Sequence, residues 1–287
     1  MAEFHPAVYN STFLFRSMHS HAYNFRMVAN SSAYASVYAG YKWLDVSLSH
    51  SLPFTQLDKN VHLKYNSLSF HFGNDACSFH PFYNSYNGLL IPEKRHSRDY
   101  VPFKDISISN AGSDFYYYAN NKTFSYHAAY DFSKKQIHNA GSFIAGITPQ
   151  WQKIKWHEPS RSLIEDSSTY SLLASNPQWL SVTGRLGYTY NIALQHGRWC
   201  IVPAVLLGAG GVKELYTSRK MIQSVSDLKG SLTAGYNGTS WYLYITGWYD
   251  NLKTNLFVKN FEERNSDISL TAGYRFCNAK RKWLGVL

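Results

Sequence analysis

The stretch Leu180–Gly210, LSVTGRLGYTYNIALQHGRWCIVPAVLLGAG, decides the fold class of this chain. From Leu180 to Gln195, apolar residues alternate with small or polar residues, which is the period-two pattern of a β-strand. A strand of a soluble protein usually has about five or six residues, so this run is long for a sandwich core. A turn at residues 196–198 leads into a second apolar run from Trp199. Two long strands joined by a tight turn, with aromatic residues near their ends, are typical of a transmembrane β-hairpin.

Length and composition fit the same class. The chain has 287 residues, enough for one large barrel or two ordinary domains. Its mean hydropathy is −0.33, and no apolar run approaches the ~18 residues that a membrane helix requires. A transmembrane barrel can have such a low mean hydropathy, because only every second residue of its strands faces lipid. The 23 Tyr and 8 Trp, against 17 Phe, suit a membrane interface, where one end of each side chain meets water.

The chain is basic, with a net charge of +10 from 28 Lys and Arg against 18 Asp and Glu. Such a balance is compatible with a nucleic-acid partner. However, the basic residues are dispersed apart from short clusters at 93–98 and 280–282, and no nucleic-acid motif accompanies them. Outer-membrane lipid and lipopolysaccharide are the simpler counterpart, with scattered solvated charge as the alternative. The sequence therefore predicts no nucleic-acid partner.

The cysteines and the first residues say little about the cellular compartment. Cys77, Cys200 and Cys277 are an odd number without regular spacing, so they predict neither a disulfide framework nor a zinc site, although one pair stays open. Met1–Phe4 lacks the basic and apolar segments of a signal peptide. A protein of the bacterial outer membrane needs such a signal, so we expect a mature or truncated start.

The remaining alternation divides the chain into about twelve strands, within a range of roughly 10–14. Residues 1–11 are predicted as a periplasmic lead-in, 12–276 as a single barrel domain and 277–287 as a C-terminal extension. Two stretches rich in Pro and charge, 84–112 and 157–178, are predicted as long loops. Loops on a rigid scaffold usually carry function, so we expect any partner protein of the envelope to bind there.

The alternation also assigns residues to the two faces of the wall. Charged residues of the polar parity are predicted to face the lumen: Arg16, Arg26, Asp45, Lys64, Arg185 and Arg275. Leu186 and Tyr188 are expected to face lipid, and Thr189 and Asn191 the lumen. Aromatic residues near strand ends are predicted to form an interfacial girdle: Trp43, Tyr188, Tyr190, Trp199, Tyr236, Trp241, Tyr274 and Phe276. A basic lumen favours anions in a pore, whereas in a filled lumen the Arg side chains would bind Tyr hydroxyls and carboxylates.

Ser125 and His127 are the candidates for catalysis. Two residues apart on a predicted strand, they face the same side, as a serine nucleophile and its base require. Ser and His are frequent in this chain, so such a coincidence is expected, and interfacial or lumen-lining His is the alternative. Neither a metal-ligand spacing nor a phosphate-binding glycine loop is present. The sequence therefore predicts no cofactor and no metal.

Several motifs resemble a known family when they are taken in order. Asn120–Tyr130, Gln136 and Ala140–Phe143 resemble the central signature of a Bacteroidota family catalogued as domain of unknown function 4421. Further motifs fall in the matching order: Tyr41–Leu44, Gly187–Asn191, Arg198–Trp199 and Gly273–Phe276. The resemblance covers about residues 8–276. It implies an outer-membrane β-barrel-like fold and supplies no catalytic residue, because no function is established for the family.

These observations together predict an all-β, antiparallel transmembrane barrel in a bacterial outer membrane. We expect it not to be an enzyme and to act as a structural barrel or as a subunit of an envelope complex. Two alternatives stay open: an outer-membrane lipid hydrolase similar to a lipid A deacylase or a phospholipase, and a narrow anion-favouring pore.

Overall fold

The computed structural model describes residues 2–17, 23–30, 33–41, 44–58, 64–93, 99–157, 164–217 and 221–275. The strands in these ranges are β1 Ala2–Arg16, β2 Tyr23–Ala29, β3 Ala33–Tyr41, β4 Leu44–Ser51, β5 Lys64–Gly73, β6 Cys77–Pro92, β7 Tyr100–Tyr118, β8 Ala140–Trp156, β9 Gln178–Leu194, β10 Trp199–Glu214, β11 Gln223–Asn237, β12 Trp241–Asn255 and β13 Asn260–Tyr274. The helices are α1 Tyr126–Ala129 and α2 Ser167–Ala174. Neither is long and apolar enough to cross a membrane, and these are the only helices of the described ranges.

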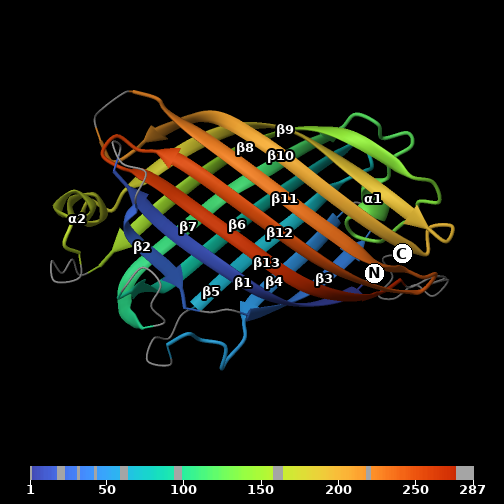
Figure 1. The fold of residues 1–287 in the computed structure, drawn as a ribbon, viewed down its shortest axis with the longest axis horizontal. Coiled ribbons are helices and arrows are strands. Elements are labelled where there is room, and N and C mark those ends of the chain that lie inside the picture. Colours follow the sequence, from blue (N-terminus) through green and yellow to red (C-terminus); the bar gives the residue numbers. More distant parts are fainter. Residues whose placement is uncertain are drawn as a thin grey trace, which may run out of the picture.

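The strands form one closed antiparallel sheet, as Figure 1 shows. From β6 to β13 each strand pairs with the next one along the chain, and β13 closes the ring by pairing with β1. The hairpin predicted within Leu180–Gly210 is β9–β10, in which Leu186 lies opposite Leu207. The predicted fold class, an antiparallel barrel of about twelve strands, is confirmed.

The wall has different numbers of strands at its two ends. Both β2 and β3 pair with β1, β2 with its last residues and β3 with its first. β6 in turn pairs with β2 at one end of the barrel and with β5 at the other. Counted over the described residues, the ring therefore has ten strands where β2 lies and twelve where β3, β4 and β5 lie. Barrel diameter grows with strand number, so the barrel is wider at the end that contains β3, β4 and β5.

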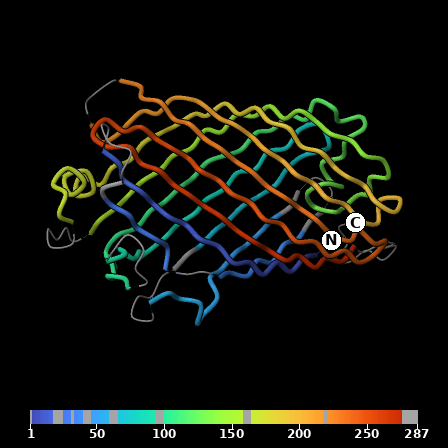
Figure 2. The backbone as a smooth tube through the Cα atoms, viewed as in Figure 1, coloured from blue at the N-terminus to red at the C-terminus, as the bar shows by residue number. Residues whose placement is uncertain are grey.

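The two ends also differ in their connections. β1 begins and β13 ends at the end that carries α1, which we call the termini end (Figures 1 and 2). The connections at the termini end are short except for one: 42–43, 74–76, 119–139, 195–198 and 238–240. The opposite end, which carries α2, is called the loop end. Its connections are mostly longer: 17–22, 52–63, 93–99, 157–177, 215–222 and 256–259.

The outer face of the wall is apolar between the two ends. Leu186 is 71% exposed, whereas its neighbour Arg185, which points inward, is 4% exposed. Thr189 and Asn191 are buried in the interior, and Tyr188 is exposed on the outside. Hydrocarbon contact on one face and a polar lumen on the other explain the strict alternation of β9.

Aromatic side chains gather on the outer face near the termini end. Trp199 lies 5.3 Å from Tyr236 and Trp241 lies 4.7 Å from Tyr274, between ring centroids. All four come from the predicted girdle. Of the other predicted members, Tyr188 is exposed and Tyr190 is half-buried, while Trp43 and Phe276 lie outside the described residues.

At the loop end the apolar side chains point inward instead. One buried cluster crosses the barrel there and includes Phe13 of β1, Phe103 of β7, Trp179 of β9 and Phe261 of β13, each at most 1% exposed. α2 adds Leu172 and Leu173 to the same cluster. The barrel is therefore filled with an apolar core at this end, as in a soluble protein.

This inward packing corrects the prediction that residues 84–112 form a loop. β6 extends to Pro92 and β7 begins at Tyr100, so that only 93–99 connect them. The pairing register of β6 shifts at Gly88, which has a φ of +75°. Such a bulge reverses the parity of the strand, and it turns Leu89 into the core. The alternation of apolar outward and polar inward residues is absent there, because apolar residues occupy both faces of the strand.

Two domain boundaries also differ from the sequence-based prediction. β1 begins at Ala2, so residues 2–11 of the predicted lead-in are part of the wall and pair with both β13 and β3. The predicted loop 157–178 ends where β9 begins at Gln178, and it contains α2. The predicted extension 277–287 lies outside the described residues.

Candidate functional site

Residues 119–139, which connect β7 to β8, fold into the barrel, and we call them the inner segment. Phe124, Ala129 and Phe132 of this segment are at most 1% exposed. The Phe132 ring stacks on Tyr244 of β12 at 4.4 Å between centroids. Tyr130 donates a hydrogen bond of 2.8 Å to Thr189 of β9. The inner segment therefore fills the lumen at the termini end.

Local hydrogen bonds explain how the inner segment folds. Ser125 is the N-cap of α1, and its Oγ accepts from the backbone N–H of Ala128 at 3.2 Å. Its own N–H donates to the side-chain oxygen of Gln136 at 2.9 Å. The Gln136 amide nitrogen in turn donates to the His138 carbonyl. Two positions of the resembling motif, Ser125 and Gln136, thus bind each other across the segment.

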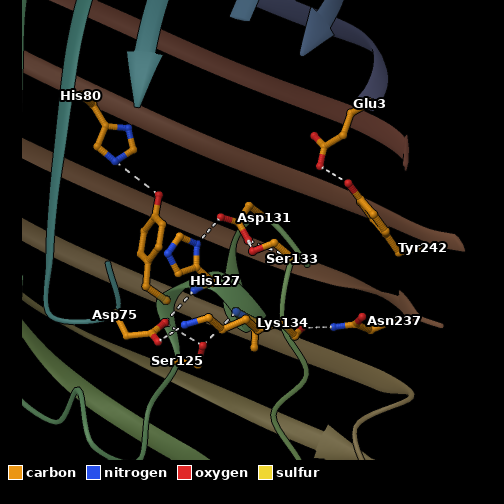
Figure 3. A network of polar contacts seen from close by, with 12 residues as sticks. Glu3, Asp75, His80, Ser125, His127, Asp131, Ser133, Lys134, Asn237 and Tyr242 are labelled. Carbon is orange, nitrogen blue, oxygen red and sulfur yellow. Dashed lines mark hydrogen bonds and ion pairs between the residues drawn. The ribbon is translucent and has the colours of Figure 1, made fainter. Parts of the chain in front are cut away.

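Asp75, in the turn between β5 and β6, holds the inner segment to the wall (Figure 3). Its Oδ1 accepts from the Ser125 hydroxyl at 2.8 Å and from the His127 backbone N–H at 3.3 Å. Its Oδ2 accepts from the Lys134 ammonium at 2.6 Å. Burial raises the pKa of Asp75, but these hydrogen bonds outweigh it and lower the pKa below its usual value. We call this group of contacts the Asp75 latch.

His127 is bound to another carboxylate of its own segment. Its Nδ1 lies 2.7 Å from Oδ2 of Asp131, and Oδ1 of Asp131 accepts from the hydroxyl of Ser133 at 2.6 Å (Figure 3). The hydrogen bond to Asp131 raises the pKa of His127, against the desolvation that lowers it. The hydrogen-bonded pair of His127 and Asp131 therefore stabilises the turn that follows α1.

The positions of Ser125 and His127 correct the prediction that they lie on one strand. Ser125 is a helix cap and His127 is in the helix, because the chain turns inward after β7. Among the described contacts, the Ser125 hydroxyl donates to Asp75, and the His127 ring binds Asp131. A serine nucleophile requires its hydroxyl within hydrogen-bond reach of the base. The contacts of both side chains instead hold the segment in place.

Two further imidazoles lie beside α1. The rings of His71 and His80 are 4.2 Å apart between centroids, and His80 Nε2 lies 3.3 Å from the Tyr126 hydroxyl. His127 lies 6.3 Å from His71 between ring centroids. Within the part of the chain that the structure describes, no group of three or more His, Cys, Asp or Glu side chains is arranged to hold a metal ion.

A cavity of about 680 Å³ lies between the inner segment and the apolar core of the loop end. Its lining on β3, β4 and β5 carries small hydroxyl residues: Ser36, Ser47, Ser49, Ser67 and Ser69. The opposite strands contribute Asp114, Arg185, Lys229 and Asp250. Because serine fills little volume, the space remains on the side of the β4–β5 hairpin.

Arg185 is the centre of the buried charges beside this cavity. Its guanidinium donates to Asp114 at 2.6 Å and also binds Asp227 and Thr148. Lys229 lies 3.5 Å from Asp114 and 3.3 Å from Asp250. These side chains come from β7, β8, β9, β11 and β12, so the network joins strands across the lumen. Buried charges persist in this way only when they are paired and hydrogen-bonded.

The other predicted lumen charges are placed differently. Arg16 binds the buried Glu262 at 2.7 Å on the side of the wall away from the core, because Phe13 and Phe15 take the inward parity of β1. Arg26 lies opposite Leu14 and also has the outward parity, since Phe25 and Met27 point into the core. Arg275 follows β13 at the rim, where it donates to the carbonyl of Gly238 at 2.5 Å. The structure describes only the backbones of Asp45 in β4 and Lys64 in β5, so it does not test their predicted orientation.

The carboxylates of the lumen are the residues that the sequence-based assignment missed. Six line the cavity: Glu3, Asp114, Asp131, Asp250, Glu263 and Asp267. Among the described lining residues they face two permanently charged cations, Arg185 and Lys229. The expectation of a basic lumen is therefore wrong for this cavity. Glu3, for example, lay in the predicted lead-in, yet it is 8% exposed and accepts from the Tyr242 hydroxyl at 2.6 Å (Figure 3).

Comparison with known proteins gives one family and several distant structures. A family model described as "Domain of unknown function (DUF4421)" matches residues 1–276, and no curated protein matches the chain. The chain is similar to the outer-membrane expressed OmpT of Vibrio cholerae at 6% identity, over 93% of this chain and 97% of that chain, with a TM-score of 0.37. It is similar to the beta domain of the Bordetella autotransporter BrkA at 12% identity, over 95% and 99%, with a TM-score of 0.45. It is also similar to a bacterial polysaccharide outer membrane secretin at 9% identity, over 96% and 99%, with a TM-score of 0.39.

Proposed function

The chain belongs to the family described as domain of unknown function (DUF4421), and we propose that it is a non-catalytic integral barrel of a bacterial outer membrane. In this proposal it acts as a structural barrel or as a membrane subunit that works with a partner. The resemblance of the inner segment to Bacteroidota sequences supports a Bacteroidota source as part of the same proposal.

The outer surface supports the membrane placement. Exposed apolar side chains follow the outward parity of neighbouring strands, for example Phe143, Leu186, Leu207 and Ile268, which are 62–71% exposed. Such an area facing water would be strongly unfavourable. Short turns and long loops at opposite ends are usual in outer-membrane barrels, where the long loops are extracellular. We therefore place the loop end outside and the termini end in the periplasm.

The filled lumen is the observation that carries the proposed role. The inner segment occupies the termini end and the apolar core occupies the loop end. A porin of similar size needs an open aqueous channel, so the arrangement disfavours the anion-favouring pore. The contacts of Ser125 with Asp75 and of His127 with Asp131 disfavour the lipid hydrolase in the same way. A rigid, closed barrel suits a protein that supports or binds another.

The loop between β8 and β9 is the best partner surface within this proposal. α2 begins at its N-cap Asp166, which binds the 3%-exposed Lys259 at 2.8 Å, and Leu172 and Leu173 anchor the helix in the core. The helix is therefore fixed to the barrel, with Ser167 and Ser171 exposed. A preorganised surface loses little conformational freedom on binding. The β6–β7 connection at 93–99, which remains of the predicted loop 84–112, lies at the same end.

Three measurements on the protein purified in mild detergent test the proposal. Flotation with lipid vesicles should place it in the membrane, and planar bilayers should show no steady conductance. Identification of co-purifying proteins should return a partner whose retention depends on residues 164–177. Hydrolysis of envelope lipid by this preparation, abolished by His127→Ala with the barrel intact, would instead establish the enzyme alternative.

A further inference from the structure

Basic residues occupy the outward face of the wall near the loop end. Four lysines share this position: Lys153 and Lys155 of β8, Lys213 of β10 and Lys253 of β12. Each lies within three residues of the loop-end terminus of its strand. Their outward parity follows from buried neighbours in the chain, such as Ile154, Val212 and Thr254. We call these four residues the lysine belt.

The belt lies immediately past the apolar band of the outer face. Lys213 is directly opposite Leu180, which is 47% exposed, and Lys153 is two residues beyond Trp151, which is opposite Leu180 on the other side. Lysine at such a boundary buries its methylene stem against apolar surface and keeps its ammonium in the head-group region. The belt is therefore at the depth of lipid head groups.

The opposite end of the same strands carries another chemistry. The outward residues of β10 and β12 near the termini end are Trp199 and Trp241, and they pair with Tyr236 and Tyr274. Along β10 and β12 the wall is thus aromatic at one interface and cationic at the other. Since the two leaflets of an outer membrane differ in composition, this asymmetry indicates a preference for one leaflet.

The charges of the belt are free to bind an external partner. Lys155, Lys213 and Lys253 are exposed and Lys153 is half-buried, and none of the four takes part in an ion pair among the described residues. Strands that carry a belt lysine alternate with strands that carry none, so that only β11 separates Lys213 from Lys253. Strands are spaced about 4.8 Å apart, which gives neighbouring ammonium columns a spacing of about 10 Å. On β11 between them, the exposed Ser224 and Ser226 contribute hydroxyls.

We propose that the lysine belt binds the phosphate groups of lipopolysaccharide in the outer leaflet. The inference rests on the proposed function for the orientation of the barrel and adds the site and its ligand. Lipid A carries two phosphate groups on a rigid disaccharide, so one molecule presents several negative charges at the depth of the belt. Ammonium groups attract such phosphates as point charges and do not need bidentate geometry.

The test uses the full-length protein in nanodiscs of phosphatidylcholine with bisphosphorylated lipid A added at increasing fractions. We compare wild type with the double variant Lys213→Gln, Lys253→Gln, and with a matched control, Lys122→Gln, Lys135→Gln, whose exposed lysines lie in the inner segment at the other end. Each lysine at an anionic surface contributes roughly a fivefold change in affinity, so the belt variant should retain lipid A on the order of 30-fold less. The control should match wild type.

Flotation of each variant is measured first, because it tests the membrane placement separately from the lipopolysaccharide site. A protein that fails to float with vesicles contradicts the proposed function itself. A belt variant that floats but retains lipid A as wild type does overturns the lipopolysaccharide site. Equal retention of phosphatidylglycerol and lipid A by wild type also overturns it, because a general anionic surface then explains the belt.

Discussion

Removal of the Asp75 carboxylate should loosen the inner segment without unfolding the barrel. Asp75→Ala deprives the Ser125 hydroxyl, the His127 N–H and the Lys134 ammonium of their common acceptor. The Lys134 side chain is 55% exposed, so its ion pair contributes about 0.5 kcal/mol. The two other hydrogen bonds contribute about 1.5 kcal/mol together. The free energy for opening the segment should fall by about 2 kcal/mol, which is roughly 30-fold in the open population.

Hydrogen exchange of the purified barrel, read by mass spectrometry, measures this opening directly. Peptides covering 119–139 should exchange about 30-fold faster in Asp75→Ala, while peptides of β9 and β10 stay unchanged. Asp75→Asn keeps an acceptor oxygen for Ser125 and His127 and loses only the charge, so a change of about twofold is expected. Lys135→Ala, at an exposed position of the same segment, is the control. Equal exchange in Asp75→Ala and Lys135→Ala would refute the latch.

Three further predictions follow from the wall, the lumen and the inner segment. Leu186→Arg places a charge on the lipid-facing side of β9 and should lower the free energy of unfolding in bilayers by about 2–4 kcal/mol in a denaturant titration; an unchanged midpoint would contradict the membrane placement. Arg185→Leu leaves the carboxylates of Asp114 and Asp227 without their guanidinium and should cost about 3–5 kcal/mol, with partial recovery when Asp227→Asn is added; without recovery, the loss comes from packing. Since the folded-state pKa of His127 is raised, its pair with Asp131 stabilises the segment fully below the unfolded pKa of about 6.5 and loses that contribution as the pH rises through the folded value. Protection of 119–139, corrected for intrinsic exchange, should therefore be higher at pH 6 than at pH 9, and His127→Gln should abolish the difference.

Strands with lipid on one side and a polar lumen on the other could be predicted from the sequence. β9 and β10 lie where the alternation from Leu180 and the apolar run from Trp199 place them, with the turn at 195–198. The dipeptide Asn237–Gly238, which is typical of a hairpin turn, likewise lies at the turn between β11 and β12. In these strands each side chain faces either lipid or the polar lumen, so apolar and polar residues alternate with the two-residue period of a β-strand.

The inner segment misleads the same reasoning because it is surrounded by the wall. Phe124, Tyr126, Tyr130 and Phe132 fall on one parity and imitate a strand, yet all four contact the interior from a helix and its flanking turns. Inside a barrel, apolar side chains find partners in every direction, so no face has to be polar. The serine cap at Ser125 is a local helix signal, but the aromatic alternation obscures it.

The sign of the lumen charge depends on which segments are assigned to the wall. Glu3 lies in the predicted lead-in, whereas Arg16 and Arg26 are among the predicted inward charges. Once β1, β11 and the loop-end core are placed, the carboxylates outnumber the permanent cations of the cavity lining, and the two arginines face outward. A lumen opened at the termini end by loosening the inner segment would therefore attract cations, in contrast to the anion-favouring alternative from the sequence. The apolar core still closes the loop end in Asp75→Ala, so the corresponding result is stronger uptake of a small cation than of a small anion by the loosened lumen, and the reverse order would mean that Arg185 and Lys229 dominate the field.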